Sequence, residues 1–210
     1  MPVIILIVVL AVAAVCAAVF FAVRAYKHRK LAEQLDKRDD DQVHYAFVIN
    51  PSKPQAEQRK QHIQEFCEAK HLTQVEYIET QLDKDGRACA LEALEHGADV
   101  VVAVGGDGTV RTVASAVSGT GHALGIIPIG TGNDFLKNFG SDMEKFRDAE
   151  NLWNGPQFPI DAIQVNDRIA LTIACSGIDA RVAKDVHKFS ESPILDGKSS
   201  YIVSLAVDFL

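Results

Sequence analysis

The first residues of the chain form one unbroken apolar run. Val3 to Val23 contains no charged residue and consists mostly of Val, Ile, Leu, Phe and Ala. At about 1.5 Å of rise per residue, a helix of this length crosses a hydrocarbon core about 30 Å thick. The pattern predicts a transmembrane anchor over residues 3–23. A cleaved signal peptide is the alternative, and it is disfavoured because no basic segment precedes the run.

The polar segment that follows predicts an orientation. Arg24, Lys27, Arg29 and Lys30 come directly after the apolar run, and basic residues favour the cytoplasmic side of a membrane. Residues 24–42 are almost entirely polar and are predicted to be a charged linker or a helical extension of the anchor. We expect a single-pass protein of the cell membrane whose folded part faces the cytoplasm.

From residue 43 onward, short apolar runs alternate with amphipathic segments. β-branched and aromatic residues predict strands, and apolar residues at helical spacing predict helices. The strands are expected at 44–49, 75–78, 100–104 and 124–127, and the helices at 58–70, 87–96, 109–117 and 143–153. This order is typical of an α/β fold with a doubly wound, mostly parallel sheet, whose ligands bind at the carboxyl ends of the strands. We expect one such domain over residues 43–158.

The pattern changes after Pro159. Two short strands are expected at 160–165 and 169–175, and Asn166-Asp167 between them indicates a hairpin. Residues 159–210 are predicted to begin a second, β-rich, sandwich-like domain. Because Tyr201 to Leu210 is apolar at helical spacing and ends without a polar residue, we expect this domain to be incomplete and the chain to be truncated.

Composition excludes several classes of function. The formal net charge of -7 leaves no basic face for nucleic acid, so no nucleic-acid partner is expected. The four cysteines show no C-x-x-C spacing, which argues against a zinc site or a disulfide framework and favours reduced, mostly buried thiols. The seven histidines form no metal-binding motif. Nothing in the sequence indicates the oligomeric state.

A glycine-rich loop follows the most apolar predicted strand. Gly105-Gly106-Asp107-Gly108-Thr109 stands between that strand and a helix, where glycines allow a close ligand and helix-start N–H groups attract phosphate. The loop lacks the endings of the Walker A and dinucleotide motifs. An aspartate here repels phosphate unless a divalent cation bridges the two, so Asp107 is a candidate metal ligand. The alternative is a tight turn in which Asp107 caps the helix.

A second loop has the same mixture of residues. Pro128 to Phe135 (PIGTGNDF) follows the next predicted strand, and the ends of neighbouring parallel strands face one pocket. Together the two loops resemble the catalytic domain of the diacylglycerol kinase family, whose relatives include the sphingosine kinases and, more remotely, the NAD kinases. The resemblance runs from about His44 to Ala180 and includes Asn50-Pro51.

The resemblance implies ATP and Mg²⁺ as cofactors and assigns residues to them. The nucleotide-binding residues would be Asn50, Thr80, Gly105, Gly106, Asp107, Gly108, Thr109, Val110, Arg111, Gly130, Thr131 and Asn133. The acids around the metal would be Asp107, Asp134 and Asp161; read alone, Asp134 fits a helix cap and Asp161 a turn residue. The family's general base lies late in the second domain, so we expect it beyond residue 210, and we expect this chain to bind ATP weakly and to transfer phosphate poorly or not at all.

Two departures from the family pattern bear on substrate and rate. The family's turn after the first strand usually runs Asn-Pro-x-Ser-Gly, whereas this chain has Asn50-Pro51-Ser52-Lys53-Pro54, which makes Lys53 a candidate phosphate contact. Many members have Asn and Glu after the glycine-rich loop, where this chain has Arg111 and Thr112.

The resemblance implies a kinase that transfers the γ-phosphate of ATP to a lipid hydroxyl, most simply converting diacylglycerol to phosphatidic acid. The expected partner is therefore a membrane lipid. An NAD kinase-like phosphotransferase is one alternative, and the Gly-Thr-Gly-Asn-Asp-Phe sequence at 130–135 argues against it. A membrane-tethered nucleotide-binding protein without catalytic activity is the other alternative.

Overall fold

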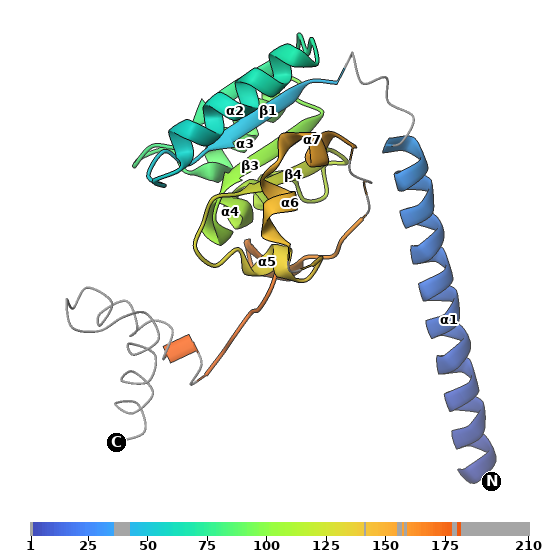
Figure 1. Ribbon diagram of the computed structural model, residues 1–210. Helices are drawn as coiled ribbons and strands as arrows, with labels where there is room; N and C mark the ends of the chain where they lie inside the picture. Colours follow the sequence, from blue (N-terminus) through green and yellow to red (C-terminus); the bar gives the residue numbers. More distant parts are fainter. Residues whose placement is uncertain are drawn as a thin grey trace. The chain divides into compact units, whose positions relative to one another are not determined.

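The core of the protein is a parallel sheet of four strands (Figure 1). The computed structural model describes residues 2–35, 43–140, 142–154, 157, 159–177 and 180–181. The strands are β1 (Tyr45–Ile49), β2 (Val75–Glu79), β3 (Val100–Gly105) and β4 (Ala123–Pro128), in the order β2-β1-β3-β4. The predicted parallel α/β fold is confirmed.

The strand order places a switch point between β1 and β3. The chain moves from β1 to β2 in one direction and from β3 to β4 in the other, and open sheets bind ligands where the order reverses in this way. The register aligns Ile49 of β1 with Glu79 and Val104, and Gly105 with Pro128. The loops that follow the four strands therefore begin at the same edge of the sheet.

Helices cover both faces of the sheet (Figure 1). Helix α2 (Ala56–Ala69) packs with α7 (Ala149–Asn154) on one face, and α3 (Gly86–Glu95) packs with α4 (Asp107–Val117) on the other. Alternate residues of a strand point to opposite faces, so large side chains meet α2 and small ones meet α3. The first set includes Tyr45, Phe47, Ile49, Val102 and Val104, and the second Ala46, Val48, Val101 and Ala103.

The region after β4 differs from the prediction. A short helix, α5 (Asp134–Lys137), was not expected, and the helix expected at 143–153 is two helices, α6 (Met143–Arg147) and α7. The break falls at Asp148, whose backbone is extended at φ -87° and ψ 123°. The Trp153 ring lies 5.0 Å from Tyr45 and 6.4 Å from Phe66 between ring centroids. This aromatic contact joins α7 to β1 and α2.

A second compact unit begins at Ile163. It contains the hairpin of β5 (Ile163–Val165) and β6 (Arg168–Ala170), which pair antiparallel. Asn166 in the turn has a φ of 55°, a conformation that asparagine adopts more readily than most residues. The hairpin confirms the turn prediction, although both strands are shorter than expected. The apolar segment predicted at 201–210 lies outside the described residues.

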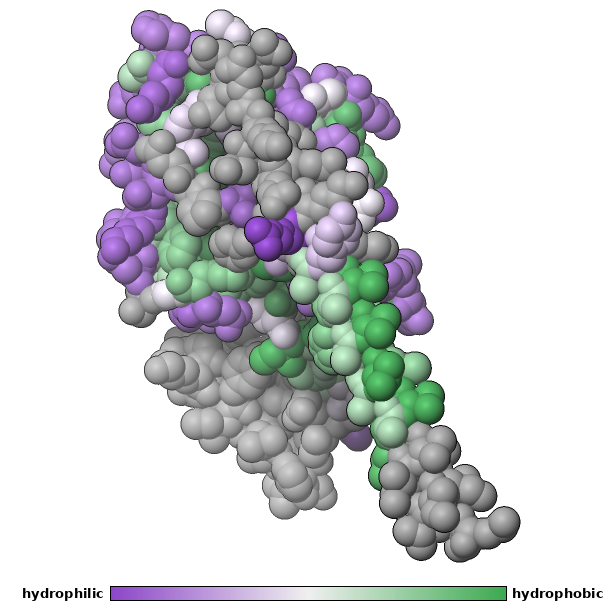
Figure 2. Space-filling model, turned by 90° about the vertical axis from the view of Figure 1, so that its right-hand side faces the viewer, coloured by the Kyte–Doolittle hydropathy of each residue, from purple (hydrophilic) through white to green (hydrophobic). Residues whose placement is uncertain are grey.

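The apolar N-terminal run is part of one long helix, α1 (Pro2–Leu35). Its described apolar side chains are exposed, and they form a band along the helix in Figure 2: Leu10, Val12, Val15, Val19, Phe20, Phe21 and Val23. Among the residues that the structure describes, no helix is both long enough and apolar enough to cross a membrane. The side chains of residues 3–9 and the linker residues 36–42 lie outside that description. The helix is confirmed, and the span stays a prediction.

Helix α3 offers a direct test of the local structure. The Asp85 side chain caps it by accepting a hydrogen bond from the Ala88 N–H at 2.9 Å. We expect Asp85→Ala to lower the free energy of unfolding by about 1 kcal/mol, measured by urea titration with circular dichroism. Asp83→Ala in the same exposed loop is the control and should change it by less than about 0.5 kcal/mol. Equal effects of the two substitutions would show that the cap contributes nothing.

Candidate active site

Two glycine-rich loops meet at the carboxyl ends of β3 and β4. A Cβ added at Gly130 would lie 2.4 Å from the Cα of Gly106, and one added at Gly106 would lie 3.1 Å from the Cα of Gly130. The Ile129 N–H also donates to the Gly105 carbonyl at 3.0 Å. No side chain fits between the two backbones, so glycine is required at this contact.

Asp107 links the two loops. Its Oδ1 accepts a hydrogen bond from the Phe135 N–H at 3.2 Å, in the first turn of α5. It does not cap its own helix, because Gly106 occupies the cap position of α4 without any side-chain hydrogen bond. The alternative in which Asp107 caps the helix that it begins is therefore wrong.

The second carboxylate oxygen of Asp107 faces Gly132. A Cβ at Gly132 would lie 3.0 Å from Asp107 Oδ2 and 3.4 Å from Asp134 Oδ2. One oxygen of each carboxylate thus lies next to the space that a side chain at position 132 would fill. Asp134 is exposed, and its Oδ1 pairs with Lys137 Nζ at 2.6 Å. Asn133, and not Asp134, precedes the first residue of α5, so the helix-cap reading of Asp134 is also wrong.

The start of α4 provides the donors for an anion. The first N–H groups of a helix have no partner within it and carry partial positive charge, and here no side chain caps them. The Val110 N–H already donates to the Gly106 carbonyl at 3.0 Å. The Val110 side chain is buried in the core and Arg111 is exposed on the helix surface. Within the predicted phosphate segment 105–111, the backbone N–H groups of Asp107, Gly108 and Thr109, the first three residues of α4, are therefore the donors for an anion.

Asn50 connects the loop after β1 to this helix start. Its Nδ2 donates to Thr109 Oγ1 at 3.2 Å, and its own N–H donates to the Val104 carbonyl at 3.0 Å. Its Oδ1 accepts from the N–H and the hydroxyl of Ser52 at 3.0 and 2.7 Å. Asn50 and Thr109 were predicted as site residues, and the structure brings them into contact.

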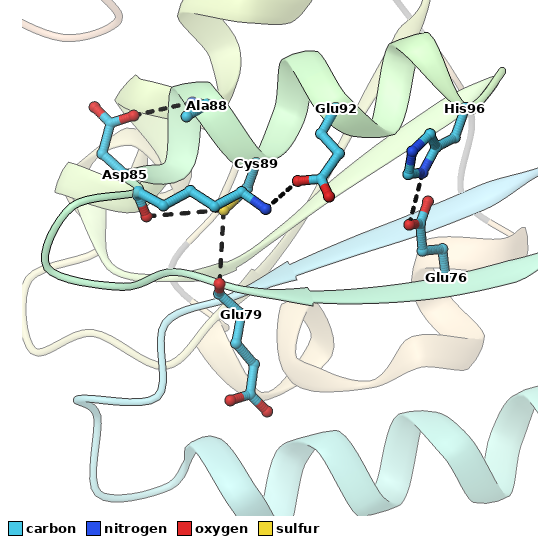
Figure 3. A network of polar contacts seen from close by, with 8 residues as sticks. Glu76, Glu79, Asp85, Ala88, Cys89, Glu92 and His96 are labelled. Carbon is cyan, nitrogen blue, oxygen red and sulfur yellow. Dashed lines mark hydrogen bonds and ion pairs between the residues drawn. The ribbon is translucent and has the colours of Figure 1, made fainter.

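Thr80 lies beside Asn50 at the same sheet edge, since its N–H donates to the Ile49 carbonyl at 2.9 Å. A polar network holds the loop that Thr80 begins (Figure 3). Lys84 pairs with Glu92 of α3, and the buried thiol of Cys89 points to the carbonyls of Glu79 and Lys84. Burial raises the pKa of the Cys89 thiol, as expected for a thiol that serves packing rather than chemistry.

Asn133 shapes the second loop. It is buried and left-handed at φ 52°, which asparagine tolerates. Its side chain accepts from the Gly130 N–H at 3.2 Å and donates to the Gly130 carbonyl at 2.7 Å. Asn133 therefore fixes the loop rather than a ligand. Thr131 is exposed beside it.

The arrangement fits Mg²⁺ at a pair of carboxylates. Mg²⁺ in kinases is usually held by one or two carboxylates together with substrate phosphates, and Asp107 and Asp134 offer such a pair beside the helix start. The predicted trio is not assembled: within the described residues no three His, Cys, Asp or Glu side chains converge. Asp161 lies in the exposed segment before β5, and its role at the metal stays a prediction.

Sequence reasoning missed two parts of the site. Gly132 was not singled out, although a side chain there would contact both carboxylates; the repeated glycine at 130 and 132 is the signal that indicates it. The other part is a cavity of about 350 Å³ beside Asn50, whose lining includes Ser52, Lys60 and Glu79. Those residues are spread over three elements, so no local motif marks them.

Replacement of glycine by alanine should affect stability differently at Gly130, which lies in the glycine contact, and at Gly108, which does not. Gly130→Ala should lower the free energy of unfolding by about 1–3 kcal/mol, because the new methyl group overlaps the Gly106 backbone. Gly108→Ala should leave it unchanged or raise it by up to about 1 kcal/mol, because a Cβ there meets no atom within 4 Å. Thermal unfolding of both variants provides the measurement. A Gly130→Ala variant as stable as the wild type would contradict the described contact.

Comparison with known proteins identifies the domain type. The family model of the diacylglycerol kinase catalytic domain matches residues 44–165, more than half of the chain. The "Probable lipid kinase YegS-like" of Alcanivorax borkumensis is 38% identical over 101 residues, which are 47% of this chain and 33% of that protein. The "Diacylglycerol kinase" of Bacillus subtilis is 35% identical over 105 residues, covering 49% and 35%. The chain thus spans about a third of the length of these relatives.

Solved structures agree on the fold. A diacylglycerol kinase from Bacillus anthracis superposes with a TM-score of 0.54 at 22% sequence identity, over 70% of this chain and 53% of that one. A second structure, of a putative diacylglycerol kinase from the same organism, gives 0.51 at 22% identity, over 60% of this chain and 44% of that one. With the two glycine-rich loops, the switch point and the family match in place, the chain belongs to the diacylglycerol kinase catalytic domain family.

Proposed function

We propose that this protein is an ATP- and Mg²⁺-dependent lipid kinase that transfers the γ-phosphate of ATP to the hydroxyl group of diacylglycerol. One observation carries the proposal: Asp107, at the uncapped start of α4, accepts a hydrogen bond from the second glycine-rich loop, and Asp107 and Asp134 each have a carboxylate oxygen beside Gly132. Carboxylates beside phosphate donors favour an anion that arrives with a divalent cation. The relatives named as diacylglycerol and lipid kinases support the choice of acceptor.

Each part of the site has a task in such a transfer. The first-turn N–H groups of α4 orient the polyphosphate, and Asn50 holds Thr109 in place behind them. Asp107 and Asp134 would hold Mg²⁺, which neutralises phosphate charge as transfer proceeds. In the reaction, the lipid hydroxyl oxygen bonds to the γ-phosphorus, the bond from that phosphorus to the bridging oxygen breaks, ADP leaves, and the hydroxyl proton passes to a base. We assign no residue of this chain as that base.

Two alternatives remain testable. An NAD kinase-like phosphotransferase would use the same first glycine-rich loop, but the second loop at 130–135 and the similarity to proteins named as lipid kinases favour a lipid acceptor. A nucleotide-binding protein without transfer activity would retain affinity for ATP and show no turnover. The identity of the phosphorylated acceptor separates all three functions.

We also propose that α1 attaches the protein to a membrane, with a single span over residues 3–23 and the kinase domain in the cytoplasm. The uncharged sequence of this run supports it, as do the exposed apolar side chains from Leu10 to Val23. A lipid substrate lies in the bilayer, so an anchor would keep the active site near it.

Substitution of Asp107 tests the site directly. Asp107→Asn keeps an oxygen that can accept from the Phe135 N–H but loses the charge, so we expect normal folding and at least about a tenfold loss of Mg²⁺-dependent ATP affinity. Asp107→Ala should lose both the affinity and the hydrogen bond from the Phe135 N–H. Calorimetric titration with ATP, with and without Mg²⁺, measures the affinity. An Asn variant with unchanged Mg²⁺-dependent affinity would sink the proposed site.

The acceptor is tested with radiolabelled ATP. The full-length protein is offered diacylglycerol, a sphingoid base, phosphatidylglycerol and NAD in parallel, with Asp107→Asn as the inactive control. We expect label in phosphatidic acid only. Label in NADP would establish the NAD kinase-like alternative, and ATP binding without any labelled product would establish the non-catalytic one.

Membrane attachment is tested in α1. Lysine near the centre of a span costs about 2.5–3.5 kcal/mol, so Val12→Lys combined with Val19→Lys should release the protein into the supernatant of an alkaline carbonate extraction. Val12→Ala combined with Val19→Ala is the matched control and should stay in the membrane pellet. If the lysine variant pellets as the wild type does, α1 is not the anchor.

A further inference from the structure

A second cavity lies between α2 and the break at Asp148 that separates α6 from α7. It has a volume of about 560 Å³. Its lining consists of Arg59, His62, Ile63, Glu65, Phe66, Glu144, Arg147, Asp148 and Ala149. This lining contains no residue of either glycine-rich loop, so the cavity is separate from the candidate active site.

Two arginine side chains of this cavity have donors without an acceptor. Nη1 of Arg59 donates to the Arg147 carbonyl at 2.7 Å, and Nη1 of Arg147 pairs with Glu144 Oε1. The Nε atoms of both arginines are buried without a hydrogen-bond partner, and within the described part of the chain no hydrogen bond or ion pair engages either Nη2. Nε and Nη2 together form one edge of a guanidinium group. A buried N–H without an acceptor costs free energy, which a bound acceptor would recover.

Three carboxylates also line the cavity, and each is already engaged. Asp148 Oδ1 accepts from the Glu150 N–H at 2.9 Å, and Glu65 Oε1 accepts from a glutamine of the same helix at 3.0 Å. The Glu144 side chain, which pairs with Arg147, is 78% exposed. Exposed ion pairs contribute little free energy, so an anion in the cavity can replace Glu144 at this arginine.

We propose that this cavity binds a phosphate-bearing anion through the Nε–Nη2 edges of Arg59 and Arg147. The planar edge of a guanidinium group donates two parallel hydrogen bonds to two oxygens of a phosphate group. Two such edges in one cavity match the charge of a phosphate monoester dianion, and His62 adds an imidazole nitrogen. Inorganic phosphate and the headgroup of phosphatidic acid both present this chemistry. The site shares no residue with the proposed lipid kinase site.

Arginine Hε signals in NMR spectra measure this binding at the two side chains themselves. The full-length protein in phosphatidylcholine bicelles is titrated with inorganic phosphate, and in a second arm the bicelles contain phosphatidic acid. We expect the Hε signals of Arg59 and Arg147 to shift, and that of Arg87, exposed on α3 outside the cavity, to stay unchanged. A shift with inorganic phosphate identifies the free ion as a ligand, and a shift with phosphatidic acid alone identifies the lipid headgroup.

Substitutions on both sides of the cavity should change the affinity in opposite directions, measured from the Arg147 Hε signal. Arg59→Lys can still donate to the Arg147 carbonyl but loses the planar edge, so it should weaken binding about three- to tenfold. Glu144→Gln removes the competing carboxylate and should strengthen binding by up to about fivefold. Glu150→Gln is the matched control: Glu150 pairs with Lys70 at 3.7 Å outside the cavity, and its substitution should not alter the affinity.

Three results would overturn the proposed anion site. Sodium chloride at matched ionic strength might be as effective as phosphate and phosphatidic acid on the Hε signals, which would mean that water accepts from the two edges. An Arg59→Lys variant with unchanged affinity would exclude the guanidinium edge as the donor. A Glu144→Gln variant that binds no more tightly would exclude competition at Arg147. Because all these signals come from α2 and α6, failure of the proposed kinase activity leaves this test unaffected.

Discussion

The active site depends on the contact between two glycine backbones, Gly106 at the end of β3 and Gly130 after β4. Because no side chain separates them, the loops approach closely enough for Asp107 of one to accept the Phe135 N–H of the other. A larger residue at either glycine would move the loops apart and remove Asp107 from the pair of carboxylates around Gly132. The same contact leaves the start of α4 open toward the sheet edge, where a phosphate can reach its N–H groups.

Sheet topology explains why this contact lies where a ligand can use it. The order β2-β1-β3-β4 reverses between β1 and β3, so Asn50 and the glycine-rich loop face each other across the switch point. The hydrogen bond from Asn50 to Thr109 then joins the two halves. The two oxygens of Asp107 have different surroundings, because one accepts the hydrogen bond that joins the loops and the other lies beside Gly132. The proposed metal ligand is thus also a structural residue.

The sheet and the two glycine-rich loops could be predicted from the sequence, because strong local patterns determine them. The buried run at 100–104 predicted a central strand, and the glycines on either side of Asp107 predicted a phosphate loop; both loops now lie at one edge of the sheet. Tertiary contacts decided the rest. The break at Asp148 accompanies the packing of Trp153 against Tyr45, and the cavity beside Asn50 combines residues from three elements. Val110 and Arg111 belong to the predicted phosphate segment 105–111. In α4, however, the Val110 side chain is buried in the core and the Arg111 side chain is exposed on the helix surface.

The proposed binding of MgATP across the two glycine-rich loops can be followed residue by residue with amide NMR of the full-length protein in micelles. Addition of MgATP should shift the N–H resonances of residues 105–109 and 130–134 far more than the rest, and Mn²⁺ in place of Mg²⁺ should broaden those nearest Asp107 and Asp134 first. Shifts centred elsewhere, such as on the cavity lined by Arg59 and Arg147, with both loops unchanged, would show that MgATP does not bind across the loops.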